Sequence, residues 1–235
     1  MIPLIVIRPE PGASATVRAA RALGLEAHGF PLFKVEPRVW DAPAPRDFDA
    51  LLVGSANALR HAGPALAAFR ALPVHAVGDA TAGAARGAGF RVTTTGSGGL
   101  QAVLCEIPAG TRVLRLAGEE RISLAPPAGV TLTERVVYGA VPQPAPHALA
   151  ALLRRAATVA LHSAEAARHF AAECDRAGLD RSVIALATIG PRVSEAAGGG
   201  WHRVATAAAP AESPLLAAAR ELCQDHGADD VRPKD

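Results

Sequence analysis

The sequence predicts an α/β protein built from two similar parallel-sheet domains. Short apolar runs alternate with amphipathic helical segments at the spacing that is typical of βαβ units. Residues 49–63 resemble residues 157–171, and a strand, a Gly turn and a helix follow one another in residues 74–90 and again in 184–201. Such an internal repeat indicates two copies of one architecture.

Composition limits the possible functions. The chain has 235 residues, is half apolar and has a formal net charge of +2, which is too small for a nucleic-acid footprint. The N-terminus, MIPLIVIRPEPG, lacks the basic start of a signal peptide. No apolar run approaches the roughly 18 residues of a membrane span. We therefore expect a cytoplasmic protein with no nucleic-acid or membrane partner.

Cysteine and histidine spacing offers no metal site. Cys105, Cys174 and Cys223 lie far apart in helical patterns, and we expect them to be reduced core thiols. We expect His162 and His169 to lie near a helix cap and on the surface, and not to bind a metal.

The elements expected in the first domain begin the chain and resume after the middle of it. Strands are expected at residues 4–8, 26–30, 159–162, 183–189 and 203–207. Helices are expected at residues 12–23, 147–156, 164–177, 192–197 and 213–226. The first helix is opened by Pro11-Gly12 and ended by Gly24, a common arrangement of helix start and stop signals.

The second domain shows the same alternation. Strands are expected at residues 49–54, 74–77, 91–95, 111–116 and 131–137. Helices are expected from Ala56 towards His61 and at residues 64–71, 82–87, 100–106 and 119–124. The strands at 4–8 and 26–30 find their counterparts at 111–116 and 131–137, so the two copies begin at different points along the chain.

This correspondence sets the expected domain boundaries. One domain joins residues 1–30 with 143–226, and the other spans 39–136. Residues 31–38 and 137–142 are expected to run side by side as a double linker, and residues 227–235 to be a disordered tail. Parallel sheets bind ligands at the carboxyl ends of their strands, so we expect a ligand cleft there between the domains.

Candidate anion-binding positions recur where a strand ends and a helix begins. Ser55, Ser97 and Ser163 occupy such positions, and so do the turns at Gly78 and Gly190. Free backbone N–H groups at a helix start attract carboxylates and phosphates. Alternatively, the serines are ordinary helix caps. The recurrence favours a polyanionic ligand, although neither a P-loop nor a GxGxxG motif is present.

Three side chains near these turns could take part in chemistry. Asp79 could be a general acid or base, or a helix cap. Thr81 could donate a hydrogen bond to a ligand or stabilise its own turn. Tyr138 is the only tyrosine and begins the second linker segment. Its phenol could donate a proton to a ligand, or its ring could pack within the linker.

Arginines are expected near the same strand ends. Arg8 ends the first strand and should point toward the ligand region. Arg115 and Arg121 flank the corresponding turn in the second domain, where Arg121 could instead pair with Glu119 and Glu120. Guanidinium groups bind carboxylates through paired hydrogen bonds, which suits an acidic ligand.

These features together resemble the uroporphyrinogen-III synthase family. The matching stretches, in chain order, are VIRPE (6–10), LGLEAHGFPLFKVEP (23–37), LLVGSANALRHA (51–62), VHAVGDATAGAARGAGF (74–90), VVYGA (136–140), VALHSAEAARHF (159–170) and ALATIGPRVSEAA (185–197). The resemblance implies two flavodoxin-like domains and a two-stranded linker. It implies that hydroxymethylbilane is cyclised to uroporphyrinogen III, with loss of water and inversion of the last pyrrole, without cofactor or metal.

The resemblance also implies site residues. Tyr138 matches the linker tyrosine and would be catalytic, as the proton donor to the departing hydroxyl group. The substrate-binding candidates are Arg8, Ser55, Ala56, Gly78, Asp79, Thr81, Arg115, Ser163, Ala164, Gly190 and Pro191. One departure is Val193, with Ser194 beside it, because the family usually has Thr at that place in the second Gly turn.

Two other functions compete with this one. A non-catalytic two-domain clamp for a polyanionic small molecule would share the duplicated architecture, but such proteins are normally exported. A nucleotide-dependent oxidoreductase would need a phosphate-binding fingerprint. For the synthase we expect a monomer whose partners are hydroxymethylbilane and, in transient contact, the preceding deaminase.

Overall fold

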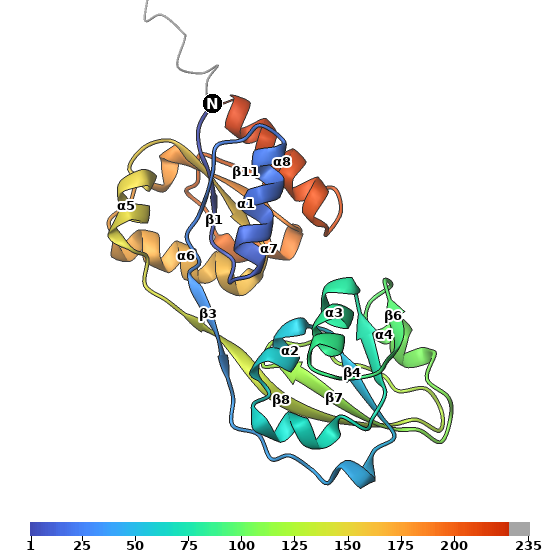
Figure 1. The fold of residues 1–235 in the computed structure, drawn as a ribbon. Helices are drawn as coiled ribbons and strands as arrows, with labels where there is room; N and C mark the ends of the chain where they lie inside the picture. Colours follow the sequence, from blue (N-terminus) through green and yellow to red (C-terminus); the bar gives the residue numbers. More distant parts are fainter. Residues whose placement is uncertain (226–235) are drawn as a thin grey trace, which may run out of the picture. The chain divides into compact units, whose positions relative to one another are not determined.

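The computed structural model describes residues 1–225, and the chain divides into two compact units (Figure 1). Unit 1 comprises Met1–Lys34 and the chain from Val141 onward, and unit 2 comprises Val35–Ala140. Each unit has a sheet of five consecutive parallel strands with helices on both faces, so the expected α/β class with flavodoxin-like sheets is confirmed. The predicted tail at 227–235 and His226 lie outside the described residues.

The sheet of unit 1 has the order β11-β10-β9-β1-β2. Its strands are β1 (Leu4–Val6), β2 (Ala27–Gly29), β9 (Ala157–Leu161), β10 (Ile184–Thr188) and β11 (Arg203–Thr206). Every pair is parallel, and Leu4 lies opposite both Ala27 and Thr158. The three central strands, β1, β9 and β10, are fully buried and nearly all apolar because helices cover both faces of the sheet.

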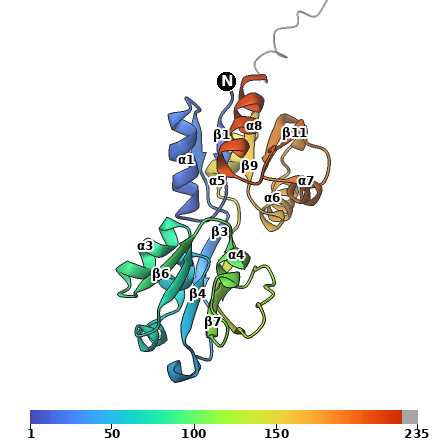
Figure 2. The same cartoon turned by 90° about the vertical axis from the view of Figure 1, so that its right-hand side faces the viewer.

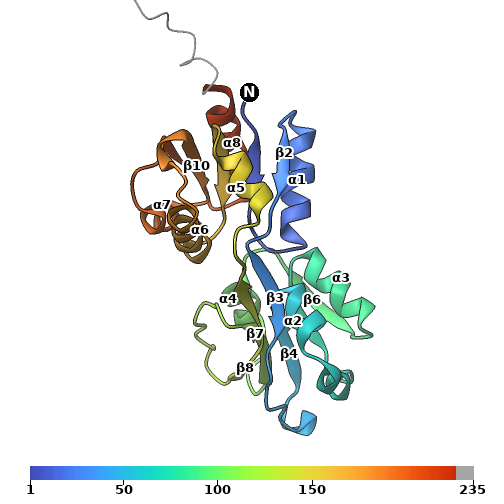
Figure 3. The ribbon, with the colours of Figure 1, turned by 90° about the vertical axis from the view of Figure 1, so that its left-hand side faces the viewer.

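Within residues 1–225, five α-helices cover this sheet, and a 3₁₀ turn (η3, Arg181–Val183) precedes β10. The helices are α1 (Gly12–Ala22), α5 (His147–Leu153), α6 (Ala164–Arg176), α7 (Pro191–Ala197) and α8 (Glu212–Asp225). α1 and α8 share one apolar core, in which Leu4 and Val6 meet Val17 and Leu215. Figures 2 and 3 show α6 and α7 on the opposite side of the sheet from α1.

The sheet of unit 2 has the order β3-β8-β7-β4-β5-β6. Its strands are β3 (Phe33–Pro37), β4 (Ala50–Val53), β5 (Val74–Val77), β6 (Val92–Gly96), β7 (Arg112–Gly118) and β8 (Thr131–Pro142). β3 and β8 are neighbours in the sheet, and the Arg38 N–H donates to the Val137 carbonyl (2.9 Å).

Three α-helices and two 3₁₀ turns complete unit 2. They are α2 (Ala56–His61), α3 (Asp79–Gly87), α4 (Leu100–Cys105), η1 (Pro45–Asp47) and η2 (Pro64–Phe69). α2 and α3 pack on one face through Leu59 and Ala82, against Leu51 and Leu114. α4 packs on the other face, where Val103 meets Leu52.

The two sheets have the same order once the chain is permuted. The order β2-β1-β9-β10-β11 in unit 1 corresponds to β8-β7-β4-β5-β6 in unit 2. β7 and β8 therefore occupy the places of β1 and β2, as the sequence correspondence predicts. In this strand order, ligands bind where the connections leave in opposite directions. Those points are the carboxyl ends of β1 and β9 in unit 1, and of β7 and β4 in unit 2.

Several local predictions were wrong. The helix expected at 119–124 is an irregular loop, and the helix expected at 64–71 is the 3₁₀ segment η2. α4 is capped by Gly99, with φ of 90°, and not by Ser97. Because glycine has no Cβ, it adopts this conformation without strain, so the cap lies at the glycine nearer the helix.

None of the described helices is long and apolar enough to cross a membrane.

Candidate functional site

A pocket of about 210 Å³ lies at the carboxyl ends of β4 and β7 in unit 2. This is the topological switch point of the sheet, where the predicted ligand region should be. The pocket brings together Ser55, Arg115 and Tyr138 from the sequence-predicted set. The other lining residues are Gly54, Leu100, Leu116, Ala117, Gly118, Glu120, Arg121 and Ile122.

Tyr138 lies in the middle of β8, opposite Gly118 of β7. A Cβ at Gly118 would lie 2.7 Å from Cζ and 2.9 Å from the hydroxyl oxygen of Tyr138, so the absence of a side chain there makes room for the ring. The Glu119 N–H donates to the Tyr138 carbonyl at 3.0 Å, which anchors the backbone. The phenol itself has no hydrogen-bond partner among the described residues and is available to a ligand.

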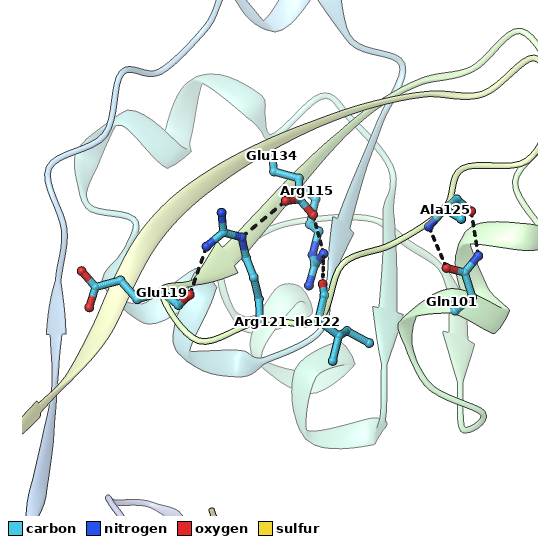
Figure 4. A network of polar contacts seen from close by, with 7 residues as sticks. All are labelled: Gln101, Arg115, Glu119, Arg121, Ile122, Ala125 and Glu134. Carbon is cyan, nitrogen blue, oxygen red and sulfur yellow. Dashed lines mark hydrogen bonds and ion pairs between the residues drawn. The ribbon is translucent and has the colours of Figure 1, made fainter. Parts of the chain in front are cut away.

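A buried arginine organises the wall of this pocket (Figure 4). The Arg115 side chain is only 3 % exposed, and its Nη1 donates to Glu134 Oε1 and, at 2.9 Å, to the Ile122 carbonyl. A buried charge needs such partners, because removing it from water is costly. Arg115 was expected to contact the ligand. Its position fits a different task, which is to hold the loop after β7 in place.

Arg121 is the more exposed arginine of the network. Its Nε lies 3.4 Å from Glu134 Oε2, and its Nη1 donates to the Glu119 carbonyl at 3.0 Å. The carboxylates of Glu119 and Glu120 were the alternative partners expected for Arg121. Instead, the Glu119 carboxylate accepts two hydrogen bonds from Arg38, at 2.7 and 2.9 Å. Glu134 takes their place because β8 runs beside β7.

The loop from 119 to 130 has a second support at its far side (Figure 4). The Gln101 side chain accepts from the Ala125 N–H (2.9 Å) and donates to the Ala125 carbonyl (2.8 Å). These bonds satisfy backbone groups that a helix would have paired internally. The loop is therefore irregular in shape but fixed at Ile122 and Ala125.

The first Gly turn opens α3 at the carboxyl end of β5. Gly78 is the N-cap, with φ of 79°, and no side chain caps the helix. Asp79 is the first helical residue, so it does not have the capping role considered for it. Asp79 is exposed in the first turn of the helix. Thr81 is buried, at 5 % exposure, and its N–H donates to the Gly78 carbonyl. The first N–H groups of α3 have no partner within the helix.

Ser55 and Ser163 each cap the helix that follows them, which is one of the two roles considered for these serines. The Ser55 hydroxyl oxygen accepts from the Asn57 N–H at 3.2 Å, and that of Ser163 from the Ala166 N–H at 3.1 Å. A capping hydroxyl uses its oxygen as acceptor and keeps its hydrogen as a donor. Ala56 and Ala164 are the first residues of α2 and α6 behind these caps.

The second Gly turn opens α7, with Gly190 as N-cap and Pro191 at the first helical position. Val193 is buried at 6 % exposure, and its N–H donates to the Gly190 carbonyl. The neighbouring Ser194 hydroxyl is engaged with Thr188 (2.6 Å) and Thr206 (2.8 Å). This hydroxyl cluster links α7 to the ends of β10 and β11.

Arg8 lies at the switch point of unit 1, near the carboxyl ends of β1 and β9. Its Nη1 donates to Glu212 Oε2 at 3.1 Å and lies 3.5 Å from Thr16 Oγ1. His162 Nε2 is 3.3 Å from the same Glu212 oxygen. His162 immediately precedes the N-cap Ser163, in the cap region where it was expected, and its side chain is only 8 % exposed.

Sequence reasoning missed Glu134, Thr16 and Glu212. No local motif marks them, because their partners lie between 8 and 204 positions away in the chain and on other elements. Glu212 had one usable signal: an acidic residue just before Ser-Pro is typical of a helix start.

The thiols are only partly as expected. Cys174 and Cys223 are buried, and burial raises the pKa of Cys174 to about 12. Cys105 is exposed, because it ends the short helix α4 on its outer side. Within residues 1–225, no group of three or more His, Cys, Asp or Glu side chains is placed to hold a metal ion.

Known proteins similar to this chain share one description. The family model described as "Uroporphyrinogen-III synthase HemD" matches residues 14–217. Among solved structures, the uroporphyrinogen-III synthetase from Helicobacter pylori aligns with a TM-score of 0.62 and 17 % identity, over 94 % of this chain and 100 % of that one. A mutant uroporphyrinogen III synthase from Thermus thermophilus aligns with a TM-score of 0.49 and 17 % identity, over 96 % and 100 %. The comparison with curated protein sequences gave no match.

Proposed function

This chain belongs to the uroporphyrinogen-III synthase family, whose model matches residues 14–217, and from that premise we propose how its own residues act. The protein is a cofactor-independent lyase of tetrapyrrole biosynthesis. It cyclises hydroxymethylbilane to uroporphyrinogen III, with loss of water and inversion of the last pyrrole ring. The proposal concerns the residues that bind the bilane and supply the proton.

The observation that carries the proposal is the switch-point pocket of unit 2 with the Tyr138 hydroxyl in its lining. Its volume of about 210 Å³ is below the ~300–1,000 Å³ of sites that enclose a whole drug-sized ligand. The pocket therefore suits one end of the bilane better than the whole molecule. We place the hydroxymethyl-bearing ring there.

Tyr138 is the proposed general acid. The hydroxyl group of the substrate leaves as water once its oxygen receives a proton from the phenol, and the electron-rich pyrrole becomes an azafulvene. Attack by the substituted carbon of the last ring then gives a spiro intermediate, from which the inverted macrocycle forms. The bilane also closes without inversion when unassisted, so the enzyme must chiefly impose a conformation.

Donors in unit 2 hold substrate carboxylates around this centre. The Ser55 hydroxyl and the Ala56 N–H open α2, and Gly78, Asp79 and Thr81 open α3. At the α3 turn the donors are the Asp79 N–H and the Thr81 hydroxyl, because the N–H groups of Gly78 and Thr81 already donate to carbonyls and the Asp79 carboxylate repels an anion. Arg115 contributes by fixing the pocket wall, and Arg121 by its charge.

Unit 1 contributes a second set of donors. These are the guanidinium of Arg8, the helix start at Ser163 and Ala164, and the Gly190 N–H. Pro191 has no N–H to donate and contributes by fixing the backbone of that turn. Arginine pairs well with carboxylates, and helix starts favour negative charge. The bilane carries eight carboxylates, so many modest contacts suit it better than one deep charged pocket.

The partners and the location are further parts of the proposal. We propose that the protein acts in the cytoplasm as a monomer, with hydroxymethylbilane as substrate and transient contact with the preceding deaminase. The free cysteines among the described residues support a reducing compartment. Size-exclusion chromatography with light scattering, with and without the deaminase, tests the monomer and the contact.

The function is tested by the products. Hydroxymethylbilane is supplied to the protein, the products are oxidised, and the ratio of type III to type I uroporphyrin is measured by chromatography. We expect type III in large excess over a protein-free control. An unchanged ratio together with tight binding of the bilane would instead support the non-catalytic clamp.

A further inference from the structure

A polar cluster at the switch point of unit 1 joins four separate segments of the chain. Arg8 follows β1, Thr16 lies on α1, His162 follows β9, and Glu212 begins α8. Glu212 is the centre: its Oε2 accepts from Arg8 Nη1 at 3.1 Å, and its Oε1 accepts from the Thr16 hydroxyl at 2.5 Å. His162 approaches Oε2 to 3.3 Å from a side chain that is 8 % exposed.

The guanidinium of Arg8 is only half used by these contacts. Both of its hydrogen bonds start from Nη1, and within residues 1–225 neither Nε nor Nη2 has a protein partner. The Arg8 side chain is 35 % exposed. A planar guanidinium binds a carboxylate through two parallel N–H groups, and the edge formed by Nε and Nη2 has this geometry.

The absence of a side chain at Gly12 makes room for the Arg8 guanidinium. A Cβ at Gly12 would lie 2.5 Å from Nε and 3.0 Å from Nη2 of Arg8, so any other residue would displace the guanidinium. Gly12 is also the first residue of α1. A carboxylate bound to this edge would therefore lie near the start of a helix of 11 residues, where negative charge is favoured.

Glu212 remains ionised under ordinary conditions. The neighbouring His162, together with Thr16 and Arg8, holds the pKa of Glu212 at about 2, although burial acts in the opposite direction. Glu212 also lies in the first turn of α8, a place that stabilises a negative side chain. A permanent negative charge is thus kept at a site where a polyanionic substrate is expected.

We propose that Glu212 is a positioning residue: it holds the guanidinium of Arg8 by Nη1 so that the edge of Nε and Nη2 faces a carboxylate of the substrate. This inference rests on the proposed function. Thr16 fixes the other oxygen of the Glu212 carboxylate by its hydroxyl, and His162 packs 3.3 Å from the oxygen that Arg8 contacts. The benefit of an ordered Arg8 outweighs the repulsion between Glu212 and the substrate, because an immobilised donor loses less entropy when it binds.

The sign of one substitution separates this role from simple electrostatics. If Glu212 positions Arg8, Glu212→Gln raises the KM for hydroxymethylbilane by about 3- to 10-fold, with kcat within about 2-fold of the wild type. If Glu212 only adds negative charge, its removal near a polyanion lowers KM. A KM that falls or stays unchanged overturns the proposal.

A double variant shows whether Glu212 acts through Arg8. Arg8→Ala should raise KM by about 10-fold, the size of one charge-assisted hydrogen bond. Arg8→Ala with Glu212→Gln should be no worse than Arg8→Ala alone, because coupled residues are not additive. Additive effects on KM, or no effect of Arg8→Ala, refute the role.

Two further variants address loss of folding and general charge effects. Gly12→Ala displaces the guanidinium without removing a charge, and should raise KM as Glu212→Gln does. Glu10→Gln is the matched control, because Glu10 lies in the same segment but accepts from the Ser14 N–H and hydroxyl. Its KM should stay within about 2-fold of the wild type. Thermal unfolding of every variant shows that the fold is kept.

Binding of uroporphyrin III separates a failure of this inference from a failure of the proposed function. Its fluorescence is titrated with wild type, Arg8→Ala and Glu212→Gln, independently of turnover. Weaker binding to both variants supports the positioning role even if the wild type forms no excess of type III product. Equal binding to all three overturns that role even if the wild type is an active synthase.

Discussion

Replacing Tyr138 with Phe removes one oxygen atom and leaves the ring in place. The phenol hydroxyl has no hydrogen-bond partner among the described residues, and the ring keeps its contact with Gly118 and its place 6.4 Å from the His61 ring. The variant should therefore fold like the wild type, with a change in unfolding free energy of at most about 0.5 kcal/mol.

The effect on the rate is expected to be much larger. A positioned general acid contributes about 10²- to 10⁴-fold, so kcat should fall by that factor, or by about 3–5 kcal/mol of activation free energy. KM should change little, because the phenol acts on the departing hydroxyl group and not on a substrate carboxylate. The residual product should contain more type I, since released intermediates close without inversion.

The assay combines initial rates with chromatography of the oxidised products at saturating hydroxymethylbilane. Gly118→Ala is a companion variant, because its Cβ would lie 2.7 Å from Tyr138 Cζ and force the ring to move. Its kcat should fall although the phenol remains. If Tyr138→Phe keeps the wild-type kcat, Tyr138 is not the proton donor and the reasoning from its position fails.

Two predictions concern stability. Glu134→Ala leaves the buried Arg115 without its carboxylate and should destabilise unit 2 by about 3 kcal/mol. Asp49→Asn, in a solvent-exposed ion pair, should cost clearly less. The free energy of unfolding of unit 2 is measured by urea unfolding, followed by the fluorescence of Trp40 in a Trp201→Phe background. Equal losses of stability in Glu134→Ala and Asp49→Asn would contradict the prediction. Arg176 and the Ala145 N–H lower the pKa of Glu173 from 4.5 to about 2, so its stabilisation is present above about pH 4.5 and is lost as the pH falls towards 2. The unfolding temperature of Glu173→Gln should therefore fall less than that of the wild type over this range, and parallel curves would refute the assignment.

Local patterns in the sequence were enough to predict the α/β class, the strands and the position of most helices. The repeat of 49–63 in 157–171 also predicted that β7 and β8 correspond to β1 and β2, which the strand order confirms. These features are short-range or periodic, so each is visible in a single stretch of chain. The candidate positions at strand ends follow from the same logic, because a parallel sheet gathers those ends at one edge.

What each candidate side chain does depended on partners far away in the chain. Arg115 lies in the pocket lining where a ligand was expected, and the strand beside β7 supplies Glu134 as its partner there. Arg8 kept its expected place at the end of β1, yet only the return of α8 brings Glu212 to it across 204 positions. The sequence pattern thus determined which edge of each sheet carries the polar residues. The tertiary structure decided which charges are neutralised there and which remain available, because pairing depends on distance in space and not along the chain.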